Sequence, residues 1–170
     1  MNFEFRHLLP EGFAPESRVW LYQASRRFMM SEALEAEEIL HQFVAGWKSH
    51  GAPVKGFATI LFGQFVLIMA DETHTGVGGC STDSSVRVVK QLEQQFQIPL
   101  FDRTQLAFIV KDKVELLPLA QFQYAAENGF INAHTIYCNN TVLTKAELET
   151  NWLIPVKDSW LAKKMPQPAQ

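Results

Sequence analysis

Apolar residues recur along the chain in short blocks whose spacing predicts strands and helices. Residues 18–24 (RVWLYQA) favour extended structure and follow a loop with two prolines and a glycine, which indicates a first strand. From Ser31, a helix-capping residue, apolar side chains recur at helical spacing as far as Trp47, and Gly51 supplies the stop. The N-terminal part is therefore expected to form one strand and one long helix.

Two further apolar blocks are expected to pair as a hairpin. Residues 54–62 and 65–70 flank Gly63-Gln64, and glycine at the first central position suits a type II′ turn. Both blocks are apolar on either face, which is typical of central strands that are covered on both sides. A helix over residues 83–96 is predicted next, because its apolar residues form a stripe along one face.

The C-terminal part of the chain contains shorter elements. Its pattern predicts a hairpin of residues 106–110 and 114–117, followed by a short helix from Pro118 to about Gly129. A second hairpin is expected from residues 134–138 and 141–143, and a helix is expected after the capping box Thr144-x-x-Glu147. Strands and helices of this number place the chain in the α+β class.

The order of elements up to residue 110 predicts a topology. Strand, helix, strand, strand, helix, strand is the ferredoxin-like, or split βαβ, order. We therefore predict a mixed sheet with helices packed on it, followed by extra hairpins and short helices. In this arrangement the strands 18–24 and 65–70 lie side by side and parallel, because right-handed crossovers connect such pairs. Their carboxyl ends share one sheet edge, which brings Arg26 close to Asp71.

Length and charge narrow the function classes. At 170 residues the chain fits one domain, which we expect to cover residues 1–165, with a disordered tail at residues 166–170. The formal net charge of -3 lacks the basic surplus that binding a phosphate backbone requires. Nucleic acid is therefore not an expected partner.

No segment predicts secretion or membrane insertion. The first residues lack the apolar run of a signal peptide, and the longest apolar stretch, residues 57–70, is shorter than the roughly 20 residues of a spanning helix. We expect a cytoplasmic protein with no membrane partner. Its cysteines, Cys80 and Cys138, form no CxxC pair, so their spacing predicts neither a zinc site nor a disulfide framework, and it identifies no cofactor.

The segment 75–85 (TGVGGCSTDSS) is the chemically distinctive part of the sequence. Glycines let backbone amides point into one concavity, and the following helix adds partial positive charge at its N-terminus, so the segment is a candidate site for a small anionic ligand. Hydroxyl groups would add donors and arginines would add countercharge. The residues assigned to this ligand site are Gly78, Gly79, Ser81, Thr82, Ser84, Ser85, Arg26 and Arg87. Two nucleotide-binding motifs are excluded: Cys80 stands where a Walker A loop requires lysine, and the glycine spacing does not match GxGxxG.

Three other hypotheses compete with ligand binding. A thiol-dependent enzyme would use Cys80 as nucleophile, His74 as base and Asp71 to orient that base, because a helix entry favours the thiolate. The simplest interpretation is an ordinary capped turn in which Cys80 packs as a small apolar residue. A non-catalytic interaction protein, pairing as a homo-oligomer through a sheet edge or an aromatic patch, is the last alternative.

Six segments of the sequence together resemble those of a family of small uncharacterised bacterial proteins of the Bacteroidetes type: VWLYQASR, WKSHG, FVLIMADE, GGCSTDSSV, PLFDR and TKAELETNWLIPVKDSW. Members of that family are often labelled "ABC transporter ATPase". The present chain has no Walker A loop and no LSGGQ-like signature. The resemblance therefore implies a small bacterial protein and transfers no activity, cofactor or catalytic residue.

Overall fold

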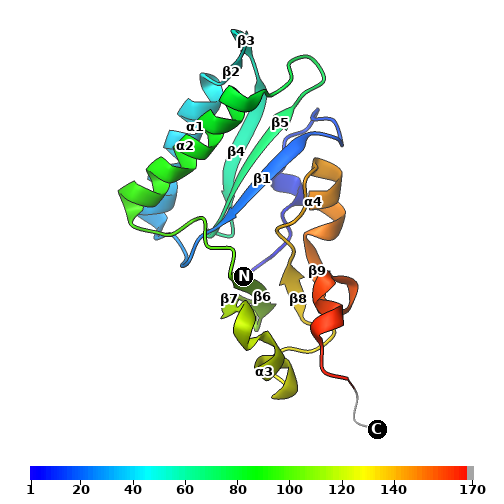
Figure 1. The fold of residues 1–170 in the computed structure, drawn as a ribbon. Coiled ribbons are helices and arrows are strands. Elements are labelled where there is room, and N and C mark those ends of the chain that lie inside the picture. The colour runs from blue at the N-terminus through cyan, green and yellow to red at the C-terminus, as the bar shows by residue number, and fades with distance from the viewer. Residues whose placement is uncertain (168–170) are drawn as a thin grey trace. The chain divides into compact units, whose positions relative to one another are not determined.

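The computed structural model describes residues 1–167 and has an α+β fold (Figure 1). Its contacts divide the chain into two compact units, which we call the N-terminal unit (residues 3–102 and 142–149) and the C-terminal unit (residues 1–2, 103–141 and 150 onward). The α-helices are α1 (Met30–Ala45), α2 (Gly79–Phe96), α3 (Phe122–Glu127) and α4 (Lys145–Asn151). The strands are β1 (Arg18–Gln23), β2 (Lys48–Ser49), β3 (Ala52–Pro53), β4 (Lys55–Leu61), β5 (Phe65–Asp71), β6 (Gln105–Val110), β7 (Lys113–Pro118), β8 (Ile136–Cys138) and β9 (Leu153–Pro155). The prediction of a single domain over residues 1–165 stays a prediction, and most of the expected tail, from residue 168, lies outside the described residues.

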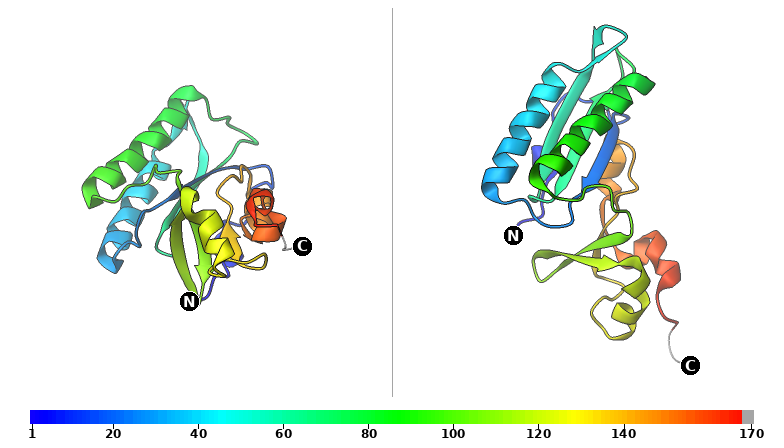
Figure 2. Two further views of the ribbon diagram at one scale, coloured as in Figure 1. Left: turned by 60° about the horizontal axis from the view of Figure 1, so that its bottom comes forward. Right: turned by 60° about the vertical axis from the view of Figure 1, so that its left-hand side comes forward.

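The N-terminal unit is built on a three-stranded sheet in the order β1-β5-β4, in which both pairings are antiparallel. All seven residues of β5 are buried, as expected for a central strand whose two faces are both covered. Helices α1 and α2 lie next to each other on one face of this sheet (Figures 1 and 2). A two-stranded hairpin, β2-β3, which the apolar pattern did not predict, follows α1.

The predicted mixed sheet, with strands 18–24 and 65–70 running parallel, is corrected by these pairings, and the complete ferredoxin-like order is not shown. Strands β1 and β5 are neighbours, but they run antiparallel, with Arg18 opposite Ala70 and Gln23 opposite Phe65. The physical reason is that α1 connects β1 to β4, and the tight β4–β5 turn then reverses the chain, so β5 inserts between two strands of the opposite direction. The sixth element of the predicted order, β6, lies in another sheet. The outer edge of β1 instead contacts Leu143 and Thr144.

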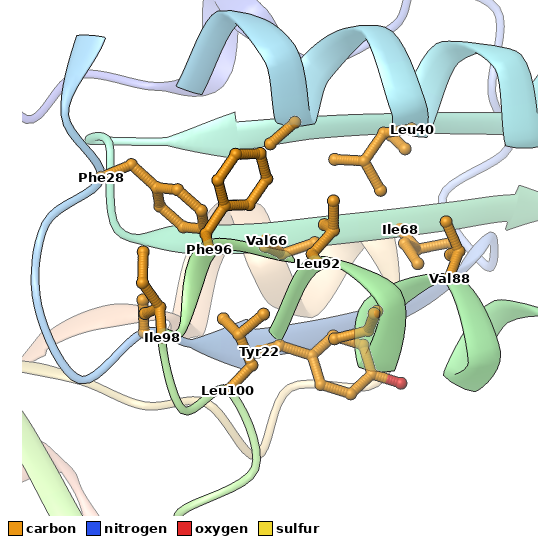
Figure 3. Packing of buried hydrophobic residues seen from close by; sticks show 14 of the residues in the cluster. Tyr22, Phe28, Leu40, Val66, Ile68, Val88, Leu92, Phe96, Ile98 and Leu100 are labelled. Atoms are coloured by element: carbon orange, nitrogen blue, oxygen red, sulfur yellow. The ribbon is translucent and has the colours of Figure 1, made fainter. Parts of the chain in front are cut away.

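The main apolar core of the N-terminal unit lies between the sheet and its two helices (Figure 3). Val66 and Ile68 point from β5 toward Leu40 of α1 and toward Val88 and Leu92 of α2. On the opposite face of the same strand, Phe65, Leu67 and Met69 are also fully buried, because successive residues of a strand face opposite sides. The apolar side chains on one face of β5 therefore pack the two helices against the sheet, and those on the other face are also shielded from water.

The C-terminal unit has its own sheet and core. Strands β7, β6, β8 and β9 pair antiparallel in that order, and Phe108, Phe122 and Tyr137 are at the centre of the apolar cluster. The predicted hairpin of 106–110 with 114–117 is confirmed as β6 and β7. The predicted hairpin of 134–138 with 141–143 is wrong, because β8 pairs with β6 and β9. The amide of Asn139 donates to the carbonyl of Trp152 (2.7 Å), which turns the chain away from a tight hairpin.

Three local details differ from the sequence prediction. Helix α2 begins at Gly79 and not at residue 83, so its first turn includes Ser81 and Thr82, which were expected to precede it. Helix α1 begins at Met30, and the backbone amide of Met29 donates to the carboxylate of Glu32 (2.8 Å). In the β4–β5 turn, the central residues are Phe62 and Gly63, and both have positive φ (55° and 65°), which is typical of a type I′ turn and not of the predicted type II′ turn at Gly63-Gln64.

Candidate functional site

Arg26 and Arg27 lie at the end of the sheet opposite the glycine-rich turn, because β1 and β5 run antiparallel. Arg26 forms a bidentate ion pair with Glu32, with its guanidinium nitrogens 2.9 and 3.0 Å from the carboxylate oxygens. This hydrogen-bonded guanidinium lowers the pKa of Glu32 to about 2. The predicted meeting of Arg26 with Asp71 is therefore wrong. Arg27 packs beside Gly63 at the β4–β5 turn.

Arg18 is the arginine that reaches the glycine-rich turn. Its Nε lies 3.4 Å from a carboxylate oxygen of Glu72, and one of its terminal nitrogens donates to the carbonyl of Val77 (3.4 Å). Its guanidinium also stacks over the ring of Trp20, 4.7 Å from the centroid. The antiparallel register explains this contact, because it places Arg18 opposite Ala70 at the end of β5. Sequence reasoning missed Arg18.

Asp71 is a structural residue of the loop that follows β5. Its carboxylate is buried and accepts hydrogen bonds from the Thr73 hydroxyl and from the backbone amides of Ala14 and Thr73, with Lys55 nearby at 3.6 Å. These contacts, led by the Thr73 hydroxyl, hold the pKa of Asp71 well below its usual range. Asp71 thus fixes the start of the turn to the N-terminal loop.

The hydroxyl groups of the turn donate to main-chain carbonyls. The bonds run from Ser81 to Lys48 (2.8 Å), from Thr82 to Gly78 (3.1 Å), from Ser84 to Cys80 (3.0 Å) and from Ser85 to Thr82 (2.6 Å). The indole N–H of Trp47 donates to the Ser81 carbonyl (3.0 Å). Ser81 and Ser85 are buried, so these two bonds satisfy groups that water cannot reach. The first turn of α2 is therefore built largely for internal support.

Cys80 and His74 are both exposed. Within residues 1–167, no hydrogen bond joins either of them to the other or to Asp71. Gly78, which precedes α2, lies beside the ring of His50, and its amide contacts the Ser49 hydroxyl at 3.4 Å. Thiol catalysis by Cys80 with His74 as base stays a prediction.

A groove of about 420 Å³ runs between α1 and α2, and it includes two of the predicted ligand residues, Ser84 and Arg87. Its lining residues are Ile39, Gln42, Phe43, Ser84, Arg87, Val88 and Gln91. Two hydrogen bonds lie on either side of it, one joining α2 to α1 and one joining α2 to Trp47, which follows α1. Trp47 binds the carbonyl of Ser81 at one end, and the Gln95 amide donates to the Glu35 carboxylate (2.6 Å) at the other. The two helices therefore run antiparallel, with the groove framed between these bonds.

The groove carries one cation, Arg87, and no acidic lining residue. Among the described residues, the guanidinium of Arg87 has no ion pair or hydrogen bond. Ser84, Arg87 and Gln91 share one face of α2 with Cys80, because positions three or four apart in a helix are neighbours. The groove residues on α2 follow a helix entry that can be recognised in the sequence. Gln42 and Phe43 lie on α1, and only the packing of the two helices brings them next to the α2 residues.

The structure and the comparisons add three negative findings. Within residues 1–167, no group of three or more histidine, cysteine, aspartate or glutamate side chains is arranged to hold a metal ion. Each helix in this range is too short or too polar to span a bilayer. Neither a protein-family model, nor a curated protein, nor a solved structure matches the chain. The family resemblance stays a prediction, and the function is inferred from geometry.

Proposed function

We propose that this protein is a cytosolic binding protein for a small organic anion, and that the ligand occupies the groove between α1 and α2. The observation that carries the proposal is Arg87, an arginine without an acidic partner among the described residues, on the wall of a groove of about 420 Å³. Ligand pockets have volumes of roughly 300–1,000 Å³ and combine apolar walls with a few polar groups. The α1–α2 groove is within this range.

The composition of the groove supports an anion that also has an apolar part. Phe43, Ile39 and Val88 provide apolar surface, while Arg87 can bind a carboxylate or phosphate in bidentate fashion. The side-chain amide of Gln91 can donate further hydrogen bonds, whereas that of Gln42 already donates to Glu38 (3.0 Å).

A screen of small anions against the intact protein tests this function. Benzoate, citrate, inorganic phosphate and AMP would each be added while thermal unfolding is followed, because a ligand that binds only the native state raises the melting temperature. At 100 times its dissociation constant, such a ligand stabilises the protein by about 2.7 kcal/mol. We expect at least one organic anion to do so, and we expect phosphate alone to be weaker.

The variant Arg87→Gln shows whether this groove is responsible. Its affinity for the stabilising anion is expected to fall by about tenfold or more, because a charge-assisted bidentate contact is removed. Lys90→Gln is the matched control, since Lys90 is an exposed cation on the same helix that does not line the groove. Equal effects of the two variants, or a screen in which no anion stabilises the protein, would contradict the proposal.

A further inference from the structure

The C-terminal unit contains a second groove, of about 520 Å³, that is separate from the site discussed above. One wall comes from the 3-10 helix Leu119–Gln121 and the start of α3, and the other from the end of the 3-10 helix Trp160–Lys164 and the residues after it. The groove is lined by Leu119, Ala120, Phe122, Gln123, Lys163, Lys164, Met165, Pro166 and Gln167. No residue of the predicted ligand site lies here.

The apolar surface of this groove is anchored in the core of the unit. Phe122 is almost fully buried and its ring stacks on that of Phe108, with centroids 6.1 Å apart and ring planes 15° apart. The apolar surface that a ligand can reach comes from Leu119, which is 37% exposed, and from Met165, which is partly buried against the same cluster. An unbranched methionine can adapt to the shape of a flexible chain, so this surface suits an aliphatic ligand.

The polar groups of the groove all favour a negative charge. Lys163 and Lys164 form the last turn of their 3-10 helix, and neither has an ion pair or hydrogen bond among the described residues. No acidic residue lines the groove, and Gln123 and Gln167 add amide donors. The C-terminal unit as a whole also carries a positive formal charge, with six lysines and arginines and four acidic residues. The N-terminal unit is negative, with nine lysines and arginines and fourteen acidic residues. In a chain of net charge -3, this groove therefore combines local positive charge with apolar surface.

We propose that the groove of the C-terminal unit binds an unbranched aliphatic carboxylate. The carboxylate contacts Lys163 and Lys164, and the chain lies on Leu119 and Met165. A small polar anion would leave this apolar surface exposed to water, and an aliphatic cation would face two like charges. Headgroup charge and chain length are therefore the two properties that the groove selects.

Titration of the full-length protein with matched amphiphiles tests both properties. Decanoate below its micelle concentration is the probe, decyltrimethylammonium has the same chain with the opposite charge, and acetate has the charge without the chain. Calorimetry is expected to show saturable binding of decanoate alone. From hexanoate to octanoate to decanoate, the affinity is expected to rise by up to about fourfold for each added methylene that is buried. Equal binding of the cationic amphiphile, or no dependence on chain length, would overturn the proposal.

Charge-reversal variants locate the site. The double variant Lys163→Glu with Lys164→Glu is expected to weaken decanoate binding by about tenfold or more. Lys111→Glu with Lys113→Glu makes the same charge change in the exposed β6–β7 turn of the same unit and is expected to leave most of the binding intact. Circular dichroism confirms that both variants are folded. Equal losses in the two double variants would show non-specific charge attraction and reject the site.

Arg87→Gln separates this inference from the proposed function. It is expected to leave decanoate affinity unchanged, because Arg87 lines only the α1–α2 groove. Loss of decanoate binding in Arg87→Gln, with retention in the lysine variant, would reject the second site and assign the ligand to the groove between α1 and α2.

Discussion

The first turn of α2 and the groove between α1 and α2 use the same helix in different ways. In the turn, the hydroxyls of Ser81 and Ser85 are buried and bonded to carbonyls of the main chain. In the groove, about two turns after the start of α2 at Gly79, the guanidinium of Arg87 faces no acidic lining residue. A high density of polar residues therefore does not identify a binding surface by itself. What matters is whether the polar groups are already bonded within the protein.

Removal of the indole that supports the turn should have the largest effect. Trp47 is buried, donates to the Ser81 carbonyl and packs against Gly56, where a Cβ atom would come within 2.8 Å of the ring. We expect Trp47→Ala to lower the free energy of unfolding by about 3–5 kcal/mol, measured by denaturant titration. Trp160→Ala, at a site that is 41% exposed, is the control with the smaller expected loss. A loss below about 1 kcal/mol for Trp47→Ala would contradict a structural role for this contact.

The next effect concerns acid stability at the start of the turn. The pKa of Asp71 is lower in the native state than its ordinary value of 3.8, so protonation favours the unfolded chain. The stabilisation by Asp71 is complete above about pH 4 to 5 and is lost as the pH falls below that range. We expect Asp71→Asn to destabilise the protein by roughly 1–3 kcal/mol at neutral pH, because an amide nitrogen cannot accept the bonds of a carboxylate.

Unfolding of wild type and Asp71→Asn between pH 2 and pH 7 measures this contribution, and the difference between the two proteins should shrink toward low pH. Asp83→Asn is the control, since Asp83 is an exposed acid on α2. A difference between wild type and Asp71→Asn that stays constant over the whole range would mean that the Asp71 carboxylate does not contribute through its charge.

Single hydroxyl deletions should sharpen the contrast within α2. Ser81→Ala removes a bond from a buried hydroxyl to the Lys48 carbonyl and should lower the free energy of unfolding by about 1 kcal/mol. Ser84→Ala removes only a bond within the helix at a partly exposed position, so its effect should stay within about 0.5 kcal/mol. Chemical denaturation of the two variants in parallel gives the comparison, and a reversed order would refute it.

The smallest effect on stability is expected at Arg87. Because its guanidinium has no partner among the described residues, Arg87→Gln should change the free energy of unfolding by less than about 0.5 kcal/mol. The same variant should lose anion binding, so the substitution should affect ligand affinity without affecting the stability of the fold. A clear loss of stability in Arg87→Gln without any ligand would show that the side chain supports the fold and would weaken its assignment to a site.

Particular elements show how far the sequence could predict the fold. The run of apolar residues in β5 correctly indicated a central strand, and Gly63 correctly indicated a tight turn before it. The direction of β5 relative to β1 was predicted wrongly, although the hairpin and the α1 crossover together require an antiparallel neighbour. Strand β9 has three residues and ends in proline, so no period of two could reveal it.

The candidate site could be predicted only in part, for a similar reason. Ser84 and Arg87, which line the α1–α2 groove, were predicted because a helix entry after glycines is a recognisable local pattern. Phe43 lies far from them in the sequence and becomes their neighbour only when the two helices pack. Arg26 was assigned wrongly because its place depended on strand direction, and Arg18 was missed for the same reason. Contacts between elements depend on topology, which local patterns do not encode.

The two hydrogen bonds that frame the α1–α2 groove have a consequence for how a ligand would bind there. Trp47 with Ser81 and Glu35 with Gln95 hold the helices together on either side of the groove. The walls therefore have their spacing before any ligand arrives, and little conformational entropy is lost when one enters. Such preorganised walls favour ligands of one width. We also expect association to be rapid, because the helices need to move little when a ligand binds.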